Sequence, residues 1–150
     1  MRPIYYIIAT CFGLGYSPIA PGTTGSILAV LVAFFLFEKS TFFLIVSIIV
    51  IFIIGTIAAS FVEKDKKLKD PSLVVIDEVA GMWISLLFIP HLWWSFLVAF
   101  GLFRLFDVIK PFPANKIQNL EGGLGIMLDD VVAGIYALIG SHLILMIINY

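Results

Sequence analysis

Long apolar runs, separated by short polar segments, dominate the order of residues along the chain. The clearest run extends from Thr41 to Val62 and is long enough to cross a bilayer as a helix, which needs about 20 residues. Shorter apolar runs cover residues 26–37, 79–89, 92–106 and 131–148. The segments between the runs carry the prolines and nearly all of the charges. This pattern predicts an all-α, polytopic membrane protein, a compact bundle of four to five helices, some of them short.

A further apolar segment lies near the N-terminus, at residues 3–15, directly after Arg2. No small-residue cleavage site of the A-x-A kind follows it, so we expect it to belong to the mature protein rather than to a signal peptide. We predict an N-terminal helix here that is either interfacial or re-entrant. The length of the chain favours one membrane-embedded domain covering residues 1–150.

Composition strengthens the membrane interpretation. Apolar residues make up 61% of the 150 residues and charged residues only 13%, whereas about a quarter of a typical soluble domain is charged. The net charge of −1 gives no overall electrostatic field that favours nucleic acid, so we expect no nucleic-acid partner, and one cysteine cannot form an intrachain disulfide. The composition excludes a disordered chain, a disulfide scaffold and an ordinary cytosolic domain.

Basic residues indicate an orientation in the membrane. The charge run 63–71 is expected to be a solvated loop, and if it is cytoplasmic, alternation of the helices also places the N-terminus and segment 104–130 on the cytoplasmic side. That side then carries Arg2, Lys64, Lys66, Lys67, Lys69, Arg104, Lys110 and Lys116, and the far side carries only Lys39. An excess of Lys and Arg is typical of cytoplasmic loops, so the sequence predicts this orientation.

The same alternation places the unusual polar clusters on one membrane face. These clusters are segment 17–26, Asp77-Glu78, Arg104 with Asp107, and Asp129-Asp130. Carboxylates at membrane depth are costly and usually functional. We therefore expect a site on the cytoplasmic face that is assembled from distant parts of the chain.

A five-residue pattern, Asp-x-Val-Ala-Gly, begins at Asp77 and again at Asp130. In a helix the Asp and the Gly of this pattern share a face, and glycine allows close helix approach in a membrane. We expect two helices to meet through Gly81 and Gly134 and to bring the two aspartates together. Hard carboxylate oxygens suit Mg²⁺. The pattern therefore makes Asp77 and Asp130 candidate metal ligands.

Two segments could bind a phosphate group, although each also has a purely structural interpretation. Arg104 and Asp107 are spaced i, i+3, so they either form a local ion pair or leave the Arg to bind phosphate and the Asp to bind a metal. Lys110 would add a positive charge nearby. Segment 17–26 contains hydroxyls and glycines before a helix, which either cap that helix or form an anion site at its N-terminus.

The glycine-rich segment 121–127 precedes the aspartate pair Asp129-Asp130. The sequence predicts a flexible loop in this segment. Its glycines would either let backbone amides approach a ligand or form a plain surface loop.

Four blocks of the chain resemble the phosphatidylglycerophosphatase A family of bacteria. They are GYSPIAPGTTGS at residues 15–26, VIDEVAGMW at 75–83, FRLFDVIKPFP at 103–113 and GGLGIMLDDVVAG at 122–134. The blocks occur in the order of the family and cover most of the chain. The resemblance implies a multi-pass, Mg²⁺-dependent phosphatase of the bacterial cytoplasmic (inner) membrane. It would convert the lipid phosphatidylglycerophosphate to phosphatidylglycerol at a site facing the cytoplasm.

The resemblance also implies roles for individual residues. The catalytic candidates are Asp77, Glu78, Asp107, Asp129 and Asp130, and the metal-ligand candidates are Asp77, Glu78, Asp107 and Asp130. The substrate-binding candidates are Thr23, Thr24, Ser26, Arg104 and Lys110. Our mechanistic hypothesis is attack by a Mg²⁺-activated water with Asp129 or Glu78 as the base, and an aspartyl-phosphate intermediate is the alternative route. The alternative function is a small cation channel or transporter with an acidic intramembrane site.

Overall fold

The computed structural model describes residues 2–38 and 40–148, and its regular structure is entirely helical over that part of the chain. The helices are α1 (Arg2–Ala9), the 3-10 helix η1 (Leu14–Tyr16), α2 (Pro21–Leu36), α3 (Thr41–Lys66), α4 (Ile76–Ser85), α5 (Trp93–Ile109), α6 (Ala114–Ile117) and α7 (Gly123–Ile147). The predicted all-α class is confirmed. The short helix α6 is an addition that the sequence pattern did not predict. Lys39, which was assigned to the far side, lies outside the described residues.

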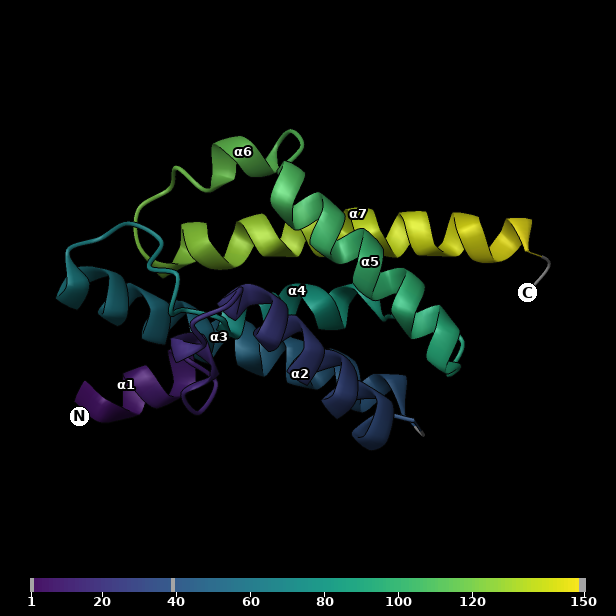
Figure 1. Ribbon diagram of the computed structural model, residues 1–150, viewed down its shortest axis with the longest axis horizontal. Coiled ribbons are helices and arrows are strands. Elements are labelled where there is room, and N and C mark those ends of the chain that lie inside the picture. The colour runs from purple at the N-terminus through teal and green to yellow at the C-terminus, as the bar shows by residue number, and fades with distance from the viewer. Residues whose placement is uncertain (1, 39, 149–150) are drawn as a thin grey trace.

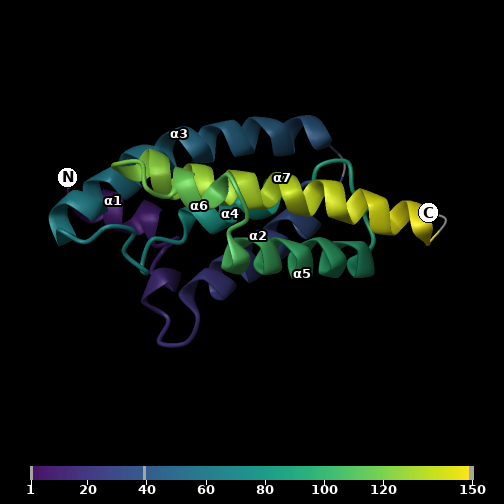
Figure 2. The same cartoon turned by 90° about the horizontal axis from the view of Figure 1, so that it is seen from above.

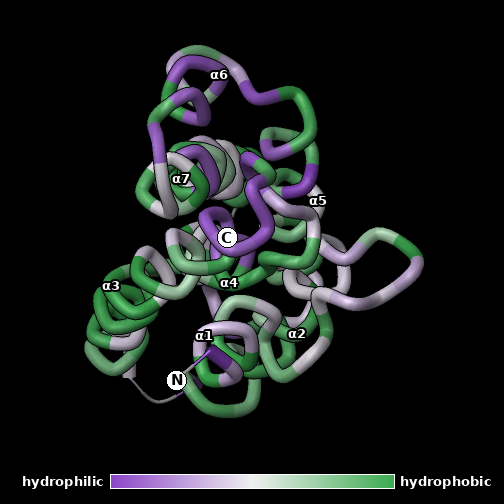
Figure 3. Tube along the Cα trace, turned by 90° about the vertical axis from the view of Figure 1, so that its left-hand side faces the viewer, coloured by the Kyte–Doolittle hydropathy of each residue, from purple (hydrophilic) through white to green (hydrophobic). Residues whose placement is uncertain are grey.

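Helix α4 lies at the centre of the fold. Figure 3 shows it surrounded by α7, α3, α2 and α5, and each of these four helices contacts it. Every residue of α4 except Glu78 is buried, including Asp77. Because α4 is enclosed, its first turn carries two acidic side chains into the interior of the molecule.

The helix boundaries differ from the apolar runs because local backbone signals override hydropathy. Helix α2 starts at Pro21, before the run that was predicted from residue 26, because proline is well suited to the first turn of a helix. Helix α3 continues past Val62 to Lys66, so part of the predicted charged loop is its last turn. Helix α4 begins and ends earlier than predicted from the run 79–89.

The glycine-rich segment is the largest correction. It was predicted as a flexible loop at 121–127, but α7 begins at Gly123 and the segment forms its first turns. A Cβ built on Gly123 would lie 2.2 Å from the carbonyl oxygen of Thr56, and one on Gly125 would lie 2.4 Å from that of Leu120. These glycines therefore allow close packing against backbone, so the prediction of a loop was wrong from Gly123 onward.

Two helices, α3 and α7, are long and apolar enough to cross a membrane. Much of the apolar surface of α3 is not covered by other helices: Phe42, Ile49, Ile53 and Ile57 are each more than half exposed. Figure 2 shows α3 on one side of α7, with α2 and α5 on the other side. Such a helix is unlike the buried core helix of a soluble protein.

The N-terminal segment packs on the charged end of α3. Tyr5 stacks on Phe61 with ring centroids 4.5 Å apart, and the Tyr6 hydroxyl donates a hydrogen bond of 2.7 Å to Asp65. Figure 1 shows α1 and this end of α3 at one end of the molecule and α6 in the same half, while the last turn of α7 lies at the other end. Helix α1 thus lies at the same end as most of the basic side chains.

Candidate active site

The first turn of α4 places Asp77 and Glu78 in the lining of a pocket. The preceding residue, Val75, donates a backbone hydrogen bond of 2.8 Å to the carbonyl of Ala9, which fixes the chain where the helix starts. Acidic side chains in the first turn interact favourably with the helix dipole. With ten residues, α4 is about 15 Å long, too short to cross a bilayer.

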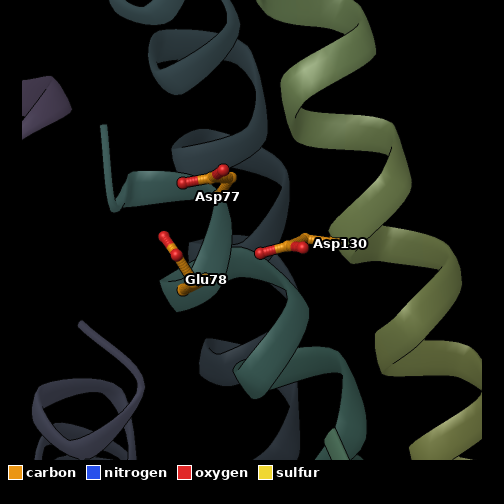
Figure 4. A group of neighbouring side chains, drawn as sticks. All are labelled: Asp77, Glu78 and Asp130. Atoms are coloured by element: carbon orange, nitrogen blue, oxygen red, sulfur yellow. The ribbon is translucent and has the colours of Figure 1, made fainter. Parts of the chain in front are cut away.

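Helices α4 and α7 meet through Gly81 and Gly134, as the repeated pattern predicted. A Cβ built on Gly134 would lie 2.4 Å from the carbonyl oxygen of Gly81, and one on Gly81 would lie 2.5 Å from the carbonyl oxygen of Asp130. Only residues without a side chain allow this approach. The contact brings Asp130 of α7 beside the first turn of α4 (Figure 4).

Three carboxylates converge at this point. One ligand atom from each of Asp77, Glu78 and Asp130 lies within 4.8 Å of the other two. Asp77 Oδ1, Glu78 Oε2 and Asp130 Oδ2 are buried and have no hydrogen-bond partner among the described residues. Buried charged oxygens without partners are costly, so this arrangement fits a bound cation.

Burial changes the proton affinity of the two acids on α4. It raises the pKa of Glu78 to about 8, and repulsion from Asp130 acts in the same direction. Burial likewise raises the pKa of Asp77 well above its ordinary value, and repulsion from Glu78 adds to the effect. Without a cation, both acids therefore bind protons more readily than ordinary carboxyl groups do.

Arg104 and Asp107 form an ion pair, one of the two arrangements considered for them, and Arg104 also contacts α2. Arg104 Nη1 lies 2.9 Å from Asp107 Oδ2 and donates a hydrogen bond of 3.3 Å to Ser26 Oγ. The Ser26 hydroxyl donates to the carbonyl of Gly22 at 2.9 Å, and Ser26 is fully buried. Ser26 thus holds Arg104 in place from behind, while Arg104 itself lines the pocket.

Lys110 and Asp129 form a second pair. Lys110 lies just after α5 and its Nζ donates a short hydrogen bond to Asp129 Oδ2. Asp129 is only 3% exposed and also accepts the backbone N–H of Asp130 through Oδ1. Lys110 lines the pocket whereas Asp129 lies behind it, so the two adjacent aspartates of α7 have different surroundings.

The pocket has a volume of about 380 Å³, and four distant segments form its walls. The residues that line it are Ala20, Pro21, Gly22, Asp70, Ser72, Val74, Asp77, Glu78, Arg104, Asp107, Val108, Lys110 and Asp130. The predicted substrate-binding residues Thr23, Thr24 and Ser26 are not in this set. The Thr24 hydroxyl donates a hydrogen bond of 2.6 Å to the carbonyl of Pro21, so Thr24 has a structural role in the first turn of α2.

The N-terminal end of α2 contributes backbone rather than hydroxyls. A Cβ built on Gly22 would lie 2.2 Å from Glu78 Oε1 and 3.3 Å from Arg104 Nη1, so a side chain there would enter the pocket. The first N–H groups of a helix lack partners within the helix and favour anions. An anion in the pocket would therefore meet this helix end together with Arg104 and Lys110.

Asp70 and Ser72 are pocket residues that the sequence interpretation did not select. Asp70 is the last acid of the charge run that was predicted to be solvated, and it is indeed exposed. Only its short separation from Asp77 along the chain could have suggested a link to the site. Asp107, a predicted metal ligand, lines the pocket as well, but its carboxylate faces Arg104.

An all-helical fold with carboxylates, an arginine and a lysine around one pocket is the arrangement expected of a metal-assisted phosphate-handling protein. The family comparison agrees with this class. The family model for phosphatidylglycerophosphatase A matches residues 7–145, and the chain belongs to that family.

Individual relatives extend the match over nearly the whole chain. A protein of Bacteroides thetaiotaomicron named "Putative phosphatidylinositol-3-phosphatase" is 40% identical over 140 residues, covering 89% of this chain and 88% of the relative. Phosphatidylglycerophosphatase A of Escherichia coli is 36% identical and that of Haemophilus influenzae 39%, with 92% and 93% of this chain covered, and 84% and 86% of the relatives. No solved structure matches the chain. These names are those of phosphatases, and none is that of a channel or transporter.

Proposed function

We propose that this protein removes the terminal phosphate monoester of phosphatidylglycerophosphate, producing phosphatidylglycerol and phosphate with the help of Mg²⁺. The family assignment and the two relatives named phosphatidylglycerophosphatase A support this substrate. The observation that carries the proposal is the pocket, which is lined by three carboxylates together with an arginine and a lysine. Each of these carboxylates has one buried oxygen with no hydrogen-bond partner among the described residues. A phosphate monoester would pair with the arginine and the lysine, and its counter-cation would pair with the carboxylates.

Asp77, Glu78 and Asp130 fit a Mg²⁺ ion by the chemistry of their donors. All three offer hard oxygen atoms, and each has a buried oxygen without a partner among the described residues. Mg²⁺, when bound, would neutralise negative charge on the phosphoryl oxygens and favour ionisation of a nearby water. Asp107 is paired with Arg104, so we assign it the role of orienting the arginine rather than of binding the metal.

Positive groups of the chain would bind the phosphoryl oxygens. Arg104 is held by Ser26 and Asp107, so its guanidinium has a fixed position in the pocket. Lys110 is held by Asp129 in the same way. Together with the N–H groups at the start of α2, these side chains would stabilise the charge that builds up as the ester bond breaks.

Glu78 is the base that we propose for the attacking water. It lines the pocket, whereas Asp129 accepts a hydrogen bond from Lys110 and lies behind the pocket wall. Glu78 would take a proton from the water as the water oxygen attacks phosphorus and the bond between phosphorus and the glycerol oxygen breaks. That proton would then pass to the glycerol oxygen, so that phosphatidylglycerol leaves as an alcohol. An aspartyl-phosphate route would instead leave phosphate on the enzyme, which an acid quench would trap.

The membrane placement is part of the proposal. We place the protein in the bacterial cytoplasmic membrane as a multi-pass protein, with α3 and α7 spanning it. Helix α1 and the charged end of α3 lie at one end of the molecule, with α6 in the same half (Figure 1), and this end would face the cytoplasm by the positive-inside rule. The pocket lies where α4 begins and α5 ends, so it would open near that face.

Phosphate release from defined lipids tests the function. Purified protein in detergent is expected to release phosphate from phosphatidylglycerophosphate, to stop when EDTA is added and to recover with Mg²⁺. Asp77→Asn and Asp130→Asn are each expected to lower turnover at least about 100-fold while the protein still inserts. Near-normal turnover in either variant would remove that residue from the site.

The choice of lipid is a separate outcome of the same assay. Phosphatidylinositol 3-phosphate carries a phosphate monoester of the same chemistry, and the Bacteroides relative is named for that substrate. Phosphatidylglycerophosphate is expected to be turned over at least ten times faster. A preference for the inositol lipid would refute the proposed substrate but would leave the chemistry of the site standing.

A further inference from the structure

A strip of exposed apolar surface runs along α5 and ends in the pocket. Its members are Leu97, Gly101, Leu105 and Val108, which we call the α5 strip. Leu97, Leu105 and Val108 are 54%, 49% and 74% exposed, although all three are apolar. Val108 is at the same time a wall of the acidic pocket, so the strip is continuous with the candidate active site.

The spacing of these residues places all of them on one face of α5. They follow one another at intervals of four, four and three residues, which is the spacing of one helix face. Arg104 lies close to the same face and points to Ser26 of α2, so the strip borders the side of α5 that turns toward α2. Figures 1 and 2 agree that α2 and α5 lie on the same side of the molecule, with α4 behind them in Figure 1.

Gly101 leaves open space in the middle of the strip. A Cβ built on it would meet no atom within 4 Å, whereas one built on Gly81 or Gly134 would collide with backbone. No packing against the rest of the described chain therefore explains this glycine. It leaves a shallow interruption between the side chains of Leu97 and Leu105.

The length of the strip matches one leaflet. The distance along the helix from Leu97 to Val108 is about 16 Å at 1.5 Å per residue. The hydrocarbon of one leaflet is about 15 Å thick, half of the roughly 30 Å core. A lipid whose phosphate lies in the pocket must send its chains out past the pocket wall, and Val108 is an apolar part of that wall.

A second apolar pocket does not offer this path. It has a volume of about 270 Å³ and lies among α1, α2, α3 and α4, with Ile76 and Val79 on one of its walls. Helix α2 packs tightly against Val75, the residue before α4, since a Cβ built on Gly25 would lie 3.0 Å from Val75 Cβ. The residues lining this second pocket are not shared with the acidic pocket, whereas Val108 joins the α5 strip to it.

We propose that an acyl chain of the phospholipid substrate lies along the α5 strip, over Gly101, while the phosphate occupies the acidic pocket. The inference rests on the proposed function. Apolar contact along the strip would make a long-chain lipid a better substrate than a short-chain analogue with the same headgroup. The strip therefore determines recognition of the lipid, separately from the chemistry at phosphorus.

Two substrates and three variants test the assignment. The substrates are dioleoyl and dihexanoyl phosphatidylglycerophosphate. Gly101→Phe fills the open space and Leu105→Ser removes apolar contact, and Ile139→Phe is the control on the exposed face of α7, where Ile139 is 53% exposed. Each strip variant is expected to raise the KM for the dioleoyl lipid about ten-fold, with kcat and the kinetics of the dihexanoyl lipid unchanged.

The outcomes distinguish the acyl-chain assignment from the proposed function. An equal effect on both substrates, no effect on either, or the same rise in KM for Ile139→Phe would each overturn the acyl-chain assignment. If Gly101→Phe does not insert, Leu105→Ser alone decides by the same comparison. Failure of the wild-type protein to release phosphate from either lipid would refute the proposed function instead.

Discussion

The contact of α4 with α7 gives a quantitative prediction for Gly134→Ala. The added methyl would lie 2.4 Å from the carbonyl oxygen of Gly81, whereas ordinary contact begins at 3.4 Å, so the helices must separate by about 1 Å. Asp130 precedes Gly134 by one helical turn and would move away from Asp77 with its helix. Mg²⁺ requires oxygen ligands at about 2.0–2.1 Å, and displacements of about 1 Å in a site can cost about 100-fold in rate.

Stability should change much less than activity in this variant. Replacing glycine by alanine inside a helix favours the helix by about 1 kcal/mol, and overpacking costs about 1–3 kcal/mol. The net loss of unfolding free energy is therefore expected to be at most about 2 kcal/mol. Gly134→Ala is thus expected to insert and remain folded while the Mg²⁺ concentration for half-maximal activity rises and turnover falls about 100-fold.

The assay is phosphate release as a function of Mg²⁺ concentration, with thermal unfolding in detergent measured alongside. Gly140→Ala is the matched control on α7, because its methyl would meet side chains only, and the nearest atom, 3.2 Å away, is the end of the Leu102 side chain, which can move. We expect the control to retain wild-type Mg²⁺ dependence. Wild-type Mg²⁺ dependence in Gly134→Ala as well would refute the claim that the glycine contact sets the spacing of the carboxylates.

Two further predictions follow from the charged groups. Burial raises the pKa of Glu78 to about 8 from 4.5, so its contribution to the stability of the metal-free protein is greatest below about pH 4.5 and is lost as pH rises through about 8. Thermal unfolding of the metal-free protein should show stability declining over this pH range, and Glu78→Gln should make the decline smaller. An equally steep decline in the variant would contradict the assignment to Glu78. Lys110→Met leaves Asp129 buried without its partner and is expected to lower the unfolding free energy by about 3 kcal/mol. The double variant with Asp129→Asn should recover most of that loss, and simple addition of two losses would show that the pair is not coupled.

The sequence predicted the membrane-type composition, the helical class and most of the polar residues that line the pocket. It succeeded at Asp77 and Asp130 because a repeated i, i+4 pattern reports which face of a helix two residues share. It failed at Gly123, because the same glycines that suggest a loop also allow helices to pack closely, and hydropathy does not distinguish these uses. It also missed Asp70, since an acid in a charged run has no local feature that marks it as part of a pocket.

Hydropathy, the glycine spacing and the order of the motifs are properties of the chain itself, so they determined the helical class and the family. Only the tertiary structure decided which acids line the pocket and which form an ion pair. Asp129 and Asp130 are neighbours in sequence, yet successive residues of a helix point in directions about 100° apart. One therefore holds Lys110, and the other joins Asp77 and Glu78 in the pocket.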